Sequence, residues 1–157
     1  MRRPERRQLA PPPVLFSLPV RVYYQDTDAG GVVYHGAYLD FFERARTEWL
    51  RRLGFDIAHL AQRDHTLFIV RELRATYARP ALLDDLVNVT VGVEHLGRAQ
   101  FTLGQQVLRG DETLVQASVN LACVTSDGFK PLRVPDTLRE TLEAGLEPCA
   151  VPSRERR

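Results

Sequence analysis

Cysteine is scarce in this chain of 157 residues, which has only Cys123 and Cys149. The two lie far apart in the sequence, and neither stands at the spacing of a zinc site. Two cysteines so placed do not predict a set of stabilising disulfides, and a reducing compartment is the simplest location for the protein. We expect a cytoplasmic protein in which Cys123 fills the core and Cys149 lies in a poorly structured tail.

Long hydrophobic runs and an excess of charge of one sign are also absent. No run of 18 or more apolar residues occurs, so the sequence predicts no membrane-spanning helix. Lys and Arg number 21 against 20 Asp and Glu, a formal net charge of +1. This balance argues against nucleic acid as an electrostatic partner. Both ends are locally basic, and peripheral membrane attachment through them stays open.

The chain between the two basic ends is long enough for one domain. Residues 1–13 carry four arginines and a Pro-Pro-Pro run, but no apolar stretch of signal-peptide length. We expect a disordered leader over residues 1–13, with a partner-binding arm as the alternative. One domain over residues 14–146 and a flexible tail over residues 147–157 complete the division. A fold of this size buries roughly 70% of the surface that its unfolded chain exposes, so it needs no covalent staples.

The first half of the chain predicts a strand and then a long helix. Val and Tyr are enriched over residues 16–25, which favours a strand. From Gly36 onward apolar residues recur at helical spacing, and Gly54 is placed to end the helix. The apolar positions, read as core, are Tyr38, Phe41, Phe42, Ala45, Trp49 and Leu53. Asp56 can cap a short helix that follows.

The second half of the chain is predicted to be rich in strands. Apolar residues alternate over residues 66–77, 86–95, 98–108 and 113–124, and the Gly110-Asp111 turn joins the last two segments. A short helix from Pro135 to about Gly145 follows, with Thr137 and Glu140 spaced as a capping box. A strand, a long helix, four antiparallel strands and a short helix make an α+β fold.

A polar turn containing two glycines joins the first strand to the long helix. It reads Asp26-Thr-Asp-Ala-Gly-Gly-Val-Val-Tyr-His-Gly-Ala-Tyr38, with carboxylates at Asp26 and Asp28 and with His35 where the helical pattern begins. The start of a helix has unpaired N–H groups and a partial positive charge, so it can stabilise an oxyanion held against it. An acid a few residues upstream can then act on the same carbon.

Three interpretations of this turn compete. Asp and Gly are ordinary turn formers, so the residues can be purely structural. The pattern D-x-D-x-G-G also begins like a calcium-binding EF-hand loop. However, Gly30 and Ala37 stand where that loop needs an oxygen ligand and its bidentate Glu. The third interpretation is an acyl-transfer site, which the bulky aromatic and apolar residues on both sides of the turn favour.

Other catalytic chemistries find little support in the sequence. The serines lack a G-x-S-x-G setting, and neither cysteine sits beside a histidine. The four histidines show no H-x-x-x-H or H-E-x-x-H spacing. We therefore expect no serine or cysteine nucleophile, no metal site and no cofactor.

A long run of residues around this turn resembles the signature of a known family. The run is Val22-Tyr-Tyr-Gln-Asp-Thr-Asp-Ala-Gly-Gly-Val-Val-Tyr-His-Gly-Ala-Tyr-Leu-Asp-Phe-Phe-Glu-Arg-Ala-Arg-Thr-Glu-Trp-Leu50. It resembles the 4-hydroxybenzoyl-CoA thioesterase family, and within it the Tol-Pal-associated acyl-CoA thioesterases of bacteria. These enzymes have the hotdog fold, a long central helix wrapped by a curved antiparallel sheet. The resemblance is specific over about residues 20–54 and looser to about residue 135.

This resemblance implies roles for three residues. Asp28 is the implied catalytic carboxylate, acting as a nucleophile or as a general base, and Tyr24 and His35 are its implied neighbours. The backbone N–H of His35, at the start of the helix, is the implied oxyanion donor. The residues themselves leave open whether Asp28 attacks the substrate directly or activates a water molecule.

Glu43, on the predicted helix, has two interpretations. Spacing favours a surface ion pair with Arg44 or Arg46. The resemblance instead raises the possibility of a functional acid, because related hotdog enzymes often place one on this helix. Neither interpretation is decided by the sequence.

The resemblance also implies a substrate and an assembly. The substrate is an acyl-CoA thioester, with acyl carrier protein as the alternative carrier, and the acyl group itself is not specified. A homodimer or homotetramer is implied, because pairing of subunits closes the open strand edges. Two rival functions remain: a hotdog protein that binds acyl-CoA without hydrolysing it, and a hotdog hydratase or dehydratase that acts on the acyl chain.

Overall fold

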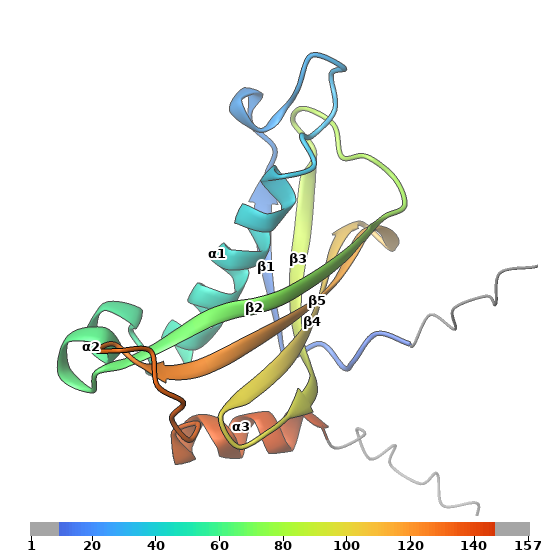
Figure 1. Cartoon of the computed structure of the whole chain (residues 1–157). Helices are drawn as coiled ribbons and strands as arrows, with labels where there is room; N and C mark the ends of the chain where they lie inside the picture. Colours follow the sequence, from blue (N-terminus) through green and yellow to red (C-terminus); the bar gives the residue numbers. More distant parts are fainter. Residues whose placement is uncertain (1–9, 147–157) are drawn as a thin grey trace, which may run out of the picture.

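The computed structural model describes residues 10–146, in which helices pack against a five-stranded antiparallel sheet (Figure 1). The predicted α+β order is confirmed. The elements are β1 (Phe16–Arg21), a 3-10 turn (Tyr24–Asp26), α1 (Ala37–Arg52), α2 (Ile57–Arg63), β2 (Thr66–Tyr77), β3 (Leu86–Leu96), β4 (Gln100–Arg109), β5 (Glu112–Thr125) and α3 (Asp136–Leu146). Residues 1–9 of the expected leader and the whole expected tail, residues 147–157, lie outside the described residues.

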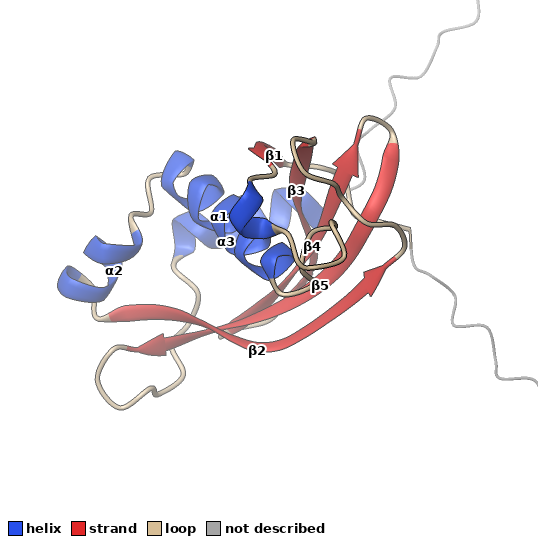
Figure 2. Ribbon diagram, turned by 90° about the horizontal axis from the view of Figure 1, so that it is seen from above, coloured by secondary structure: helices blue, strands red, loops and turns tan. Residues whose placement is uncertain are grey.

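The sheet has the strand order β1-β3-β4-β5-β2, and every neighbouring pair is antiparallel. Its edge strands are therefore β1 and β2. Figure 2 shows α1 and α3 on the same face of the sheet, with the long strands β2 and β5 curving round them. This is the hotdog arrangement, a long helix held against a curved sheet.

The apolar stripe of α1 fills the centre of the molecule, as its periodicity predicts. Phe41, Phe42 and Ala45 have no exposed surface, and Tyr38 and Trp49 are each 2% exposed. They pack with the fully buried valines of β3 in one core cluster. The helix ends at Arg52, and Gly54 follows with a φ of +91°, a conformation that glycine adopts without strain.

One predicted strand end and one predicted helix cap are wrong. The first strand ends at Arg21 and not at residue 25, because the Tyr23 N–H bonds the Asp26 side chain at 2.8 Å and bends the chain into the 3-10 turn. The capping box at Thr137 is not formed. Helix α3 begins at Asp136, and the Pro135 carbonyl accepts the Arg139 N–H at 2.8 Å, so Thr137 lies inside the first turn.

The segment before β1 lies across the face of the sheet that points away from α1. Gly92 of β3 pairs with Gly104 of β4, and Pro12 rests on them. A Cβ atom on Gly104 would come within 2.6 Å of the Pro12 ring, and one on Gly92 within 2.6 Å of the Pro13 carbonyl oxygen. The two glycines thus make room for residues 12 and 13, the end of the expected leader.

Candidate active site

The loop from β1 to α1 lies at one end of the molecule, beside the loop that joins β2 to β3 (Figure 1). The first loop folds back on itself through a bridge between Thr27 and Val33. A second bridge ties Val32 to Leu82 of the neighbouring loop, and the Val33 N–H donates to the Ala81 carbonyl at 2.9 Å. The position of the site loop therefore depends on residues about fifty positions further along the chain.

Asp28 occupies the tip of this loop and is exposed. Its Oδ1 accepts the Gly30 N–H at 2.8 Å, and its backbone N–H donates to the Val32 carbonyl at 2.9 Å. Gly31 has a φ of +77°, so the turn depends on glycine at that position. Within residues 10–146 the Oδ2 atom has no hydrogen-bond partner. The side chain therefore forms the turn and still presents one free carboxylate oxygen to solvent.

Asp26, two residues earlier, is buried where Asp28 is exposed. It is 9% exposed, and its Oδ2 accepts the Tyr23 N–H at 2.8 Å. Its carbonyl accepts the Tyr34 N–H at 2.8 Å, which closes the loop across its base. Asp26 consequently supports the fold of the loop, whereas the Asp28 side chain is open to solvent.

The start of α1 offers unpaired backbone donors. Gly36 is the N-cap residue of this helix of 16 residues, and no side chain caps it. In the described part of the chain neither the His35 N–H nor the Gly36 N–H donates to an acceptor. These groups lie at the positive end of the helix dipole, where an oxyanion is stabilised. The His35 N–H, the predicted oxyanion donor, is thus one of the unpaired backbone groups at this end of the helix.

The ring of His35 is exposed and lies near two tyrosine rings, tilted against Tyr34 and edge-on to Tyr77. Its centroid lies 4.4 Å from that of Tyr34 and 6.5 Å from that of Tyr77. No hydrogen bond joins either ring nitrogen to another group within residues 10–146. The ring therefore packs beside the loop without a hydrogen bond, and the unpaired group of His35 is its backbone N–H.

Tyr77, the last residue of β2, is a site residue that the sequence did not single out. Its hydroxyl donates to the His35 carbonyl at 3.1 Å, and its ring lies 5.6 Å from that of Tyr38. The Tyr38 hydroxyl in turn accepts the Ala81 N–H at 2.9 Å, and burial raises the pKa of Tyr38 although this hydrogen bond opposes the shift. The sequence showed Tyr77 only as one position of an alternating strand, because its partner lies 42 residues away.

Tyr24 does not join the other two predicted residues. Its side chain is 82% exposed, and within residues 10–146 its hydroxyl and ring have no hydrogen-bond or aromatic partner. Only its carbonyl is engaged, accepting from the backbone and hydroxyl of Thr27 at 3.1 and 2.7 Å. The structure thus brings Asp28 and His35 onto one folded loop and leaves the Tyr24 ring in solvent.

An ion pair holds the neighbouring loop. Asp85 Oδ2 lies 2.7 Å from Arg109 and also accepts the Leu82 N–H at 2.9 Å. Partial burial raises the pKa of Asp85, but the Leu82 and Arg109 hydrogen bonds outweigh it and hold the pKa below its usual range. The ionised form of Asp85 therefore stabilises the loop against which Val32 and Val33 rest.

Glu43 does not form the ion pair that its spacing favoured. In the described residues no Lys or Arg lies within 4.0 Å of its carboxylate. Arg46 lies on the buried side of α1 and is only 8% exposed, where its Nη1 donates to Gln105 Oε1 at 2.9 Å. The ion-pair interpretation fails because burial directs Arg46 into the core.

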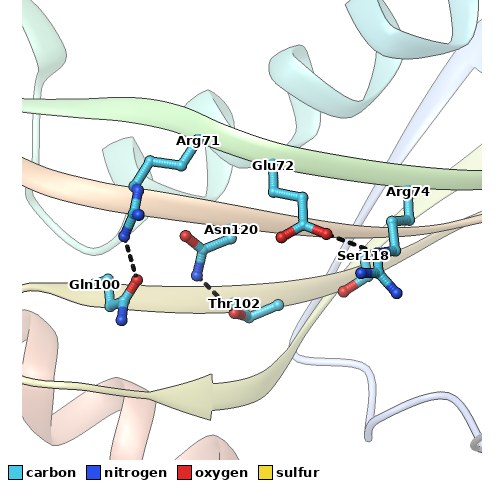
Figure 3. Close-up of a pocket in the computed structure, with 7 residues that line it drawn as sticks. All are labelled: Arg71, Glu72, Arg74, Gln100, Thr102, Ser118 and Asn120. Atoms are coloured by element: carbon cyan, nitrogen blue, oxygen red, sulfur yellow. Dashed lines mark hydrogen bonds and ion pairs between the residues drawn. The ribbon is translucent and has the colours of Figure 1, made fainter.

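A polar hollow of about 490 Å³ lies on the face of the sheet away from α1 (Figure 3). Its side chains pair mostly with one another: Arg74 with Glu72 at 2.7 Å, and Arg71 with Gln100 at 2.9 Å. Ser118 donates to Glu94 at 2.7 Å, and no histidine within residues 10–146 hydrogen-bonds the pair. The hollow therefore lacks the Ser-His arrangement of a serine hydrolase.

Neither a metal cluster nor a membrane span is found over residues 10–146. No group of three or more His, Cys, Asp or Glu side chains in this part of the chain could hold a metal ion. No helix described here is long and apolar enough to cross a membrane.

Known proteins resemble this chain in both sequence and fold. The model of the thioesterase superfamily matches residues 30–116. An acyl-CoA thioesterase YbgC of Haemophilus influenzae is 45% identical over 79% of this chain and 91% of its own length. An acyl-CoA thioester hydrolase YbgC of Escherichia coli is 39% identical over 79% of this chain and 92% of its own. The crystal structure of a probable thioesterase from Bartonella henselae superposes with a TM-score of 0.73 and 39% identity, covering 76% of this chain and 98% of that one.

Proposed function

The chain belongs to the thioesterase superfamily, and from this membership we propose that it hydrolyses acyl-CoA thioesters to a carboxylic acid and coenzyme A. The relatives named as acyl-CoA thioesterases support this enzyme class, since their similarity extends over most of both chains. The observation that carries the site is the unpaired N–H at the start of α1, with the exposed carboxylate of Asp28 on the same loop.

In the proposed reaction the thioester carbonyl lies against the start of α1. Its oxygen accepts the His35 N–H, and the Gly36 N–H is a second donor within the same turn. As the carbonyl carbon becomes tetrahedral, the negative charge on its oxygen is stabilised by these donors and by the helix dipole. Removal of one such donor typically costs about 10²–10³ in kcat, so the helix start accounts for a large share of the expected rate.

Asp28 supplies the attacking group in one of two ways. In direct attack, Oδ2 bonds to the carbonyl carbon, the C–S bond breaks and coenzyme A leaves as its thiolate. Water then hydrolyses the resulting anhydride and restores the carboxylate. In the alternative, Asp28 takes a proton from water and the hydroxide attacks the same carbon. The C–S bond then breaks, coenzyme A leaves as its thiolate, and the proton on Asp28 passes to the thiolate or to solvent. We favour direct attack because a carboxylate is a weak general base at neutral pH.

Two tyrosines are assigned supporting roles. Tyr77 is a positioning residue, because its hydroxyl holds the His35 carbonyl and so the orientation of the peptide groups at the helix start. We assign Tyr24 to orienting Asp28 or the attacking water. Its ring is 82% exposed, so it is accessible to a bound substrate or to a second subunit.

We further propose a homodimer or homotetramer with the site at a subunit boundary. Strand β2 is a sheet edge of 12 residues, and Val70 and Tyr77 on it are 48% and 46% exposed. An open edge of this length invites pairing with another copy. Sedimentation at micromolar concentration should give no active monomer, and an active monomer would defeat this part of the proposal.

A cytoplasmic location and the identity of the carrier complete the proposal. Cys123, the cysteine that the structure describes, is a buried free thiol, which suits a reducing compartment. Coenzyme A is favoured as carrier because the relatives are named for it, and acyl carrier protein is the alternative to be compared in the same assay.

Thiol release measured with a colorimetric reagent tests the activity. A panel of acyl-CoA thioesters of increasing length, together with one acyl carrier protein thioester, should reveal at least one substrate that releases free thiol. A protein that only binds acyl-CoA would release none. A hydratase would remove the absorbance of an enoyl-CoA and leave its thioester intact.

A further inference from the structure

A second cavity lies between the later turns of α1 and the sheet, away from the Asp28 loop. Its volume is about 230 Å³. Most of its lining is apolar and comes from α1, α2 and the strands, including Leu50, Ile57, Phe68, Val70, Phe101 and Leu103. Three polar residues of α1, Glu43, Arg46 and Thr47, share the lining.

Arg46 is the unusual member of this lining, because it is a buried cation without an anion. It is 8% exposed, and no carboxylate in the described residues lies within 4.0 Å of its guanidinium. Burial lowers its pKa, and the charge of Glu43 only partly opposes that shift. A buried charge is costly unless it is paired, so this guanidinium favours an anionic neighbour.

A fixed amide holds the guanidinium in place. Arg46 Nη1 donates to Gln105 Oε1 at 2.9 Å. The other end of that amide, Gln105 Nε2, donates to the carbonyls of Phe42 and Thr90 at 3.1 and 3.3 Å, which determines the direction in which its oxygen points. Gln105 has no exposed surface, so this arrangement is rigid. Arg46 is thereby anchored by one nitrogen.

The remaining donors of Arg46, a residue that lines the cavity, keep some accessible surface. Within residues 10–146, the Nε atom of Arg139 is the only side-chain nitrogen that is inaccessible to solvent and has no hydrogen-bond partner. The Nε and Nη2 atoms of Arg46 also have no hydrogen-bond partner in this part of the chain. Because they are not among the inaccessible atoms, they retain some accessible surface. A guanidinium presents its donors in a planar fork that matches a carboxylate.

We propose that this cavity binds a carboxylate attached to an apolar group, with the carboxylate on Arg46 and the apolar group against the surrounding rings and leucines. Two sources share this chemistry. One is a free carboxylic acid, the product class of the reaction. The other is a second carboxylate at the far end of an acyl chain, and this source rests on the proposed thioesterase function.

The cavity is a subsite separate from the proposed reaction centre of the same subunit. Arg46 follows Gly36 by ten residues along α1, which is about 15 Å at roughly 1.5 Å per residue. A free acid can therefore occupy the cavity without covering the start of the helix. An acyl chain from the same subunit must be long enough to span that distance.

Calorimetry with hexanoate and its uncharged analogue hexanamide tests the carboxylate site directly on the full chain. We expect hexanoate to bind about tenfold to a hundredfold more tightly than hexanamide, the range of a hydrogen bond between charged groups. Arg46→Met should bring the two affinities together. Arg44→Met, an exposed arginine on the same helix, is the matched control and should keep the difference.

Turnover of acyl-CoA pairs that end in carboxylate or methyl, in a series of chain lengths, tests the second source. A preference for the carboxylate that is lost in Arg46→Met identifies the acyl chain as the ligand, even if hexanoate alone binds weakly. If Arg46→Met fails to fold, Arg46→Gln replaces it in both experiments, because its side-chain amide retains a donor for Gln105. No dependence on Arg46 in either experiment would overturn the proposal. Absence of thiol release from every substrate would instead count against the proposed function and leave the hexanoate result standing.

Discussion

The 3-10 turn at Tyr24–Asp26 and the turn from Asp28 to Gly31 lie side by side in the chain, and each contains one aspartate. In the first turn the carboxylate is 9% exposed and is bonded to the Tyr23 N–H. In the second, the carboxylate is exposed and keeps one oxygen free within the described residues. The comparison teaches that a D-x-D pair can divide its tasks, with one acid buried and holding the loop and the other exposed to solvent.

Asp28→Asn is the strongest test of this division. Asn supports the same turn and can accept the Gly30 N–H, but it can neither attack a thioester nor take a proton from water. We expect kcat to fall by about 10²–10⁴ with the melting temperature unchanged. Thiol release and thermal unfolding measure the two effects. Retained turnover would show that Asp28 only forms the turn.

Trapping the acyl group sharpens the same test. If Asp28 attacks directly, mass spectrometry of the wild-type protein quenched during turnover should detect an acylated Asp28, and the Asn variant should show none. Absence of the adduct, combined with the expected loss of turnover in Asp28→Asn, would favour activation of a water molecule.

Asp26→Ala should produce the opposite pattern. It removes the carboxylate that accepts the partly buried Tyr23 N–H, and loss of a hydrogen bond to a charged group costs about 1.5–3 kcal/mol of unfolding free energy. Once the folded fraction is corrected for, kcat should change far less than in Asp28→Asn. Asp26→Asn retains an acceptor oxygen and should lose less stability than Asp26→Ala. A larger loss of kcat at Asp26 than at Asp28 would reverse the assignment of the two acids.

Asp85→Asn tests whether the loop between β2 and β3 stabilises the neighbouring loop that carries Asp28. It removes the charged partner of Arg109, and we expect a loss of about 1–2 kcal/mol in stability. The pKa of Asp85 is lowered in the folded state, so its contribution is present above the unfolded-state pKa and is lost as the pH falls through the folded-state pKa. Denaturation followed between neutral and acidic pH should show a smaller pH dependence in the variant. Equal pH dependence in both proteins would contradict this role.

Tyr77→Phe should have the smallest effect. It removes one hydrogen bond to the His35 carbonyl and keeps the ring packed on Tyr38, a change of about 0.5–1.5 kcal/mol. We expect a several-fold decrease in kcat with little change in KM, because the helix start loses part of its orientation. A change in melting temperature without any change in kcat would show that Tyr77 is only structural.

Local patterns in the sequence were enough to predict most of the elements. The apolar spacing of α1, the cap at Asp56 and the turn at Gly110 each depend on residues within a few positions, and all three are found. The α+β order followed from them. The hotdog fold was inferred from resemblance, since periodicity alone does not specify how a sheet curves. The ends of β1 and α3 were misjudged by one to four residues, where turn hydrogen bonds replaced the expected pattern.

The sequence by itself therefore determined the helix, the strands and the short-range turns, because these depend on neighbouring residues, whereas the position of the loop that carries Asp28 and His35 depends on its contacts with Ala81 and Leu82. Only the tertiary structure decided which aspartate is buried, that Tyr77 reaches His35, and that Arg46 turns inward to Gln105. The last two contacts join residues 42 and 59 positions apart. Burial and long-range hydrogen bonds exist only once the strands have been brought together, so no local pattern contains them.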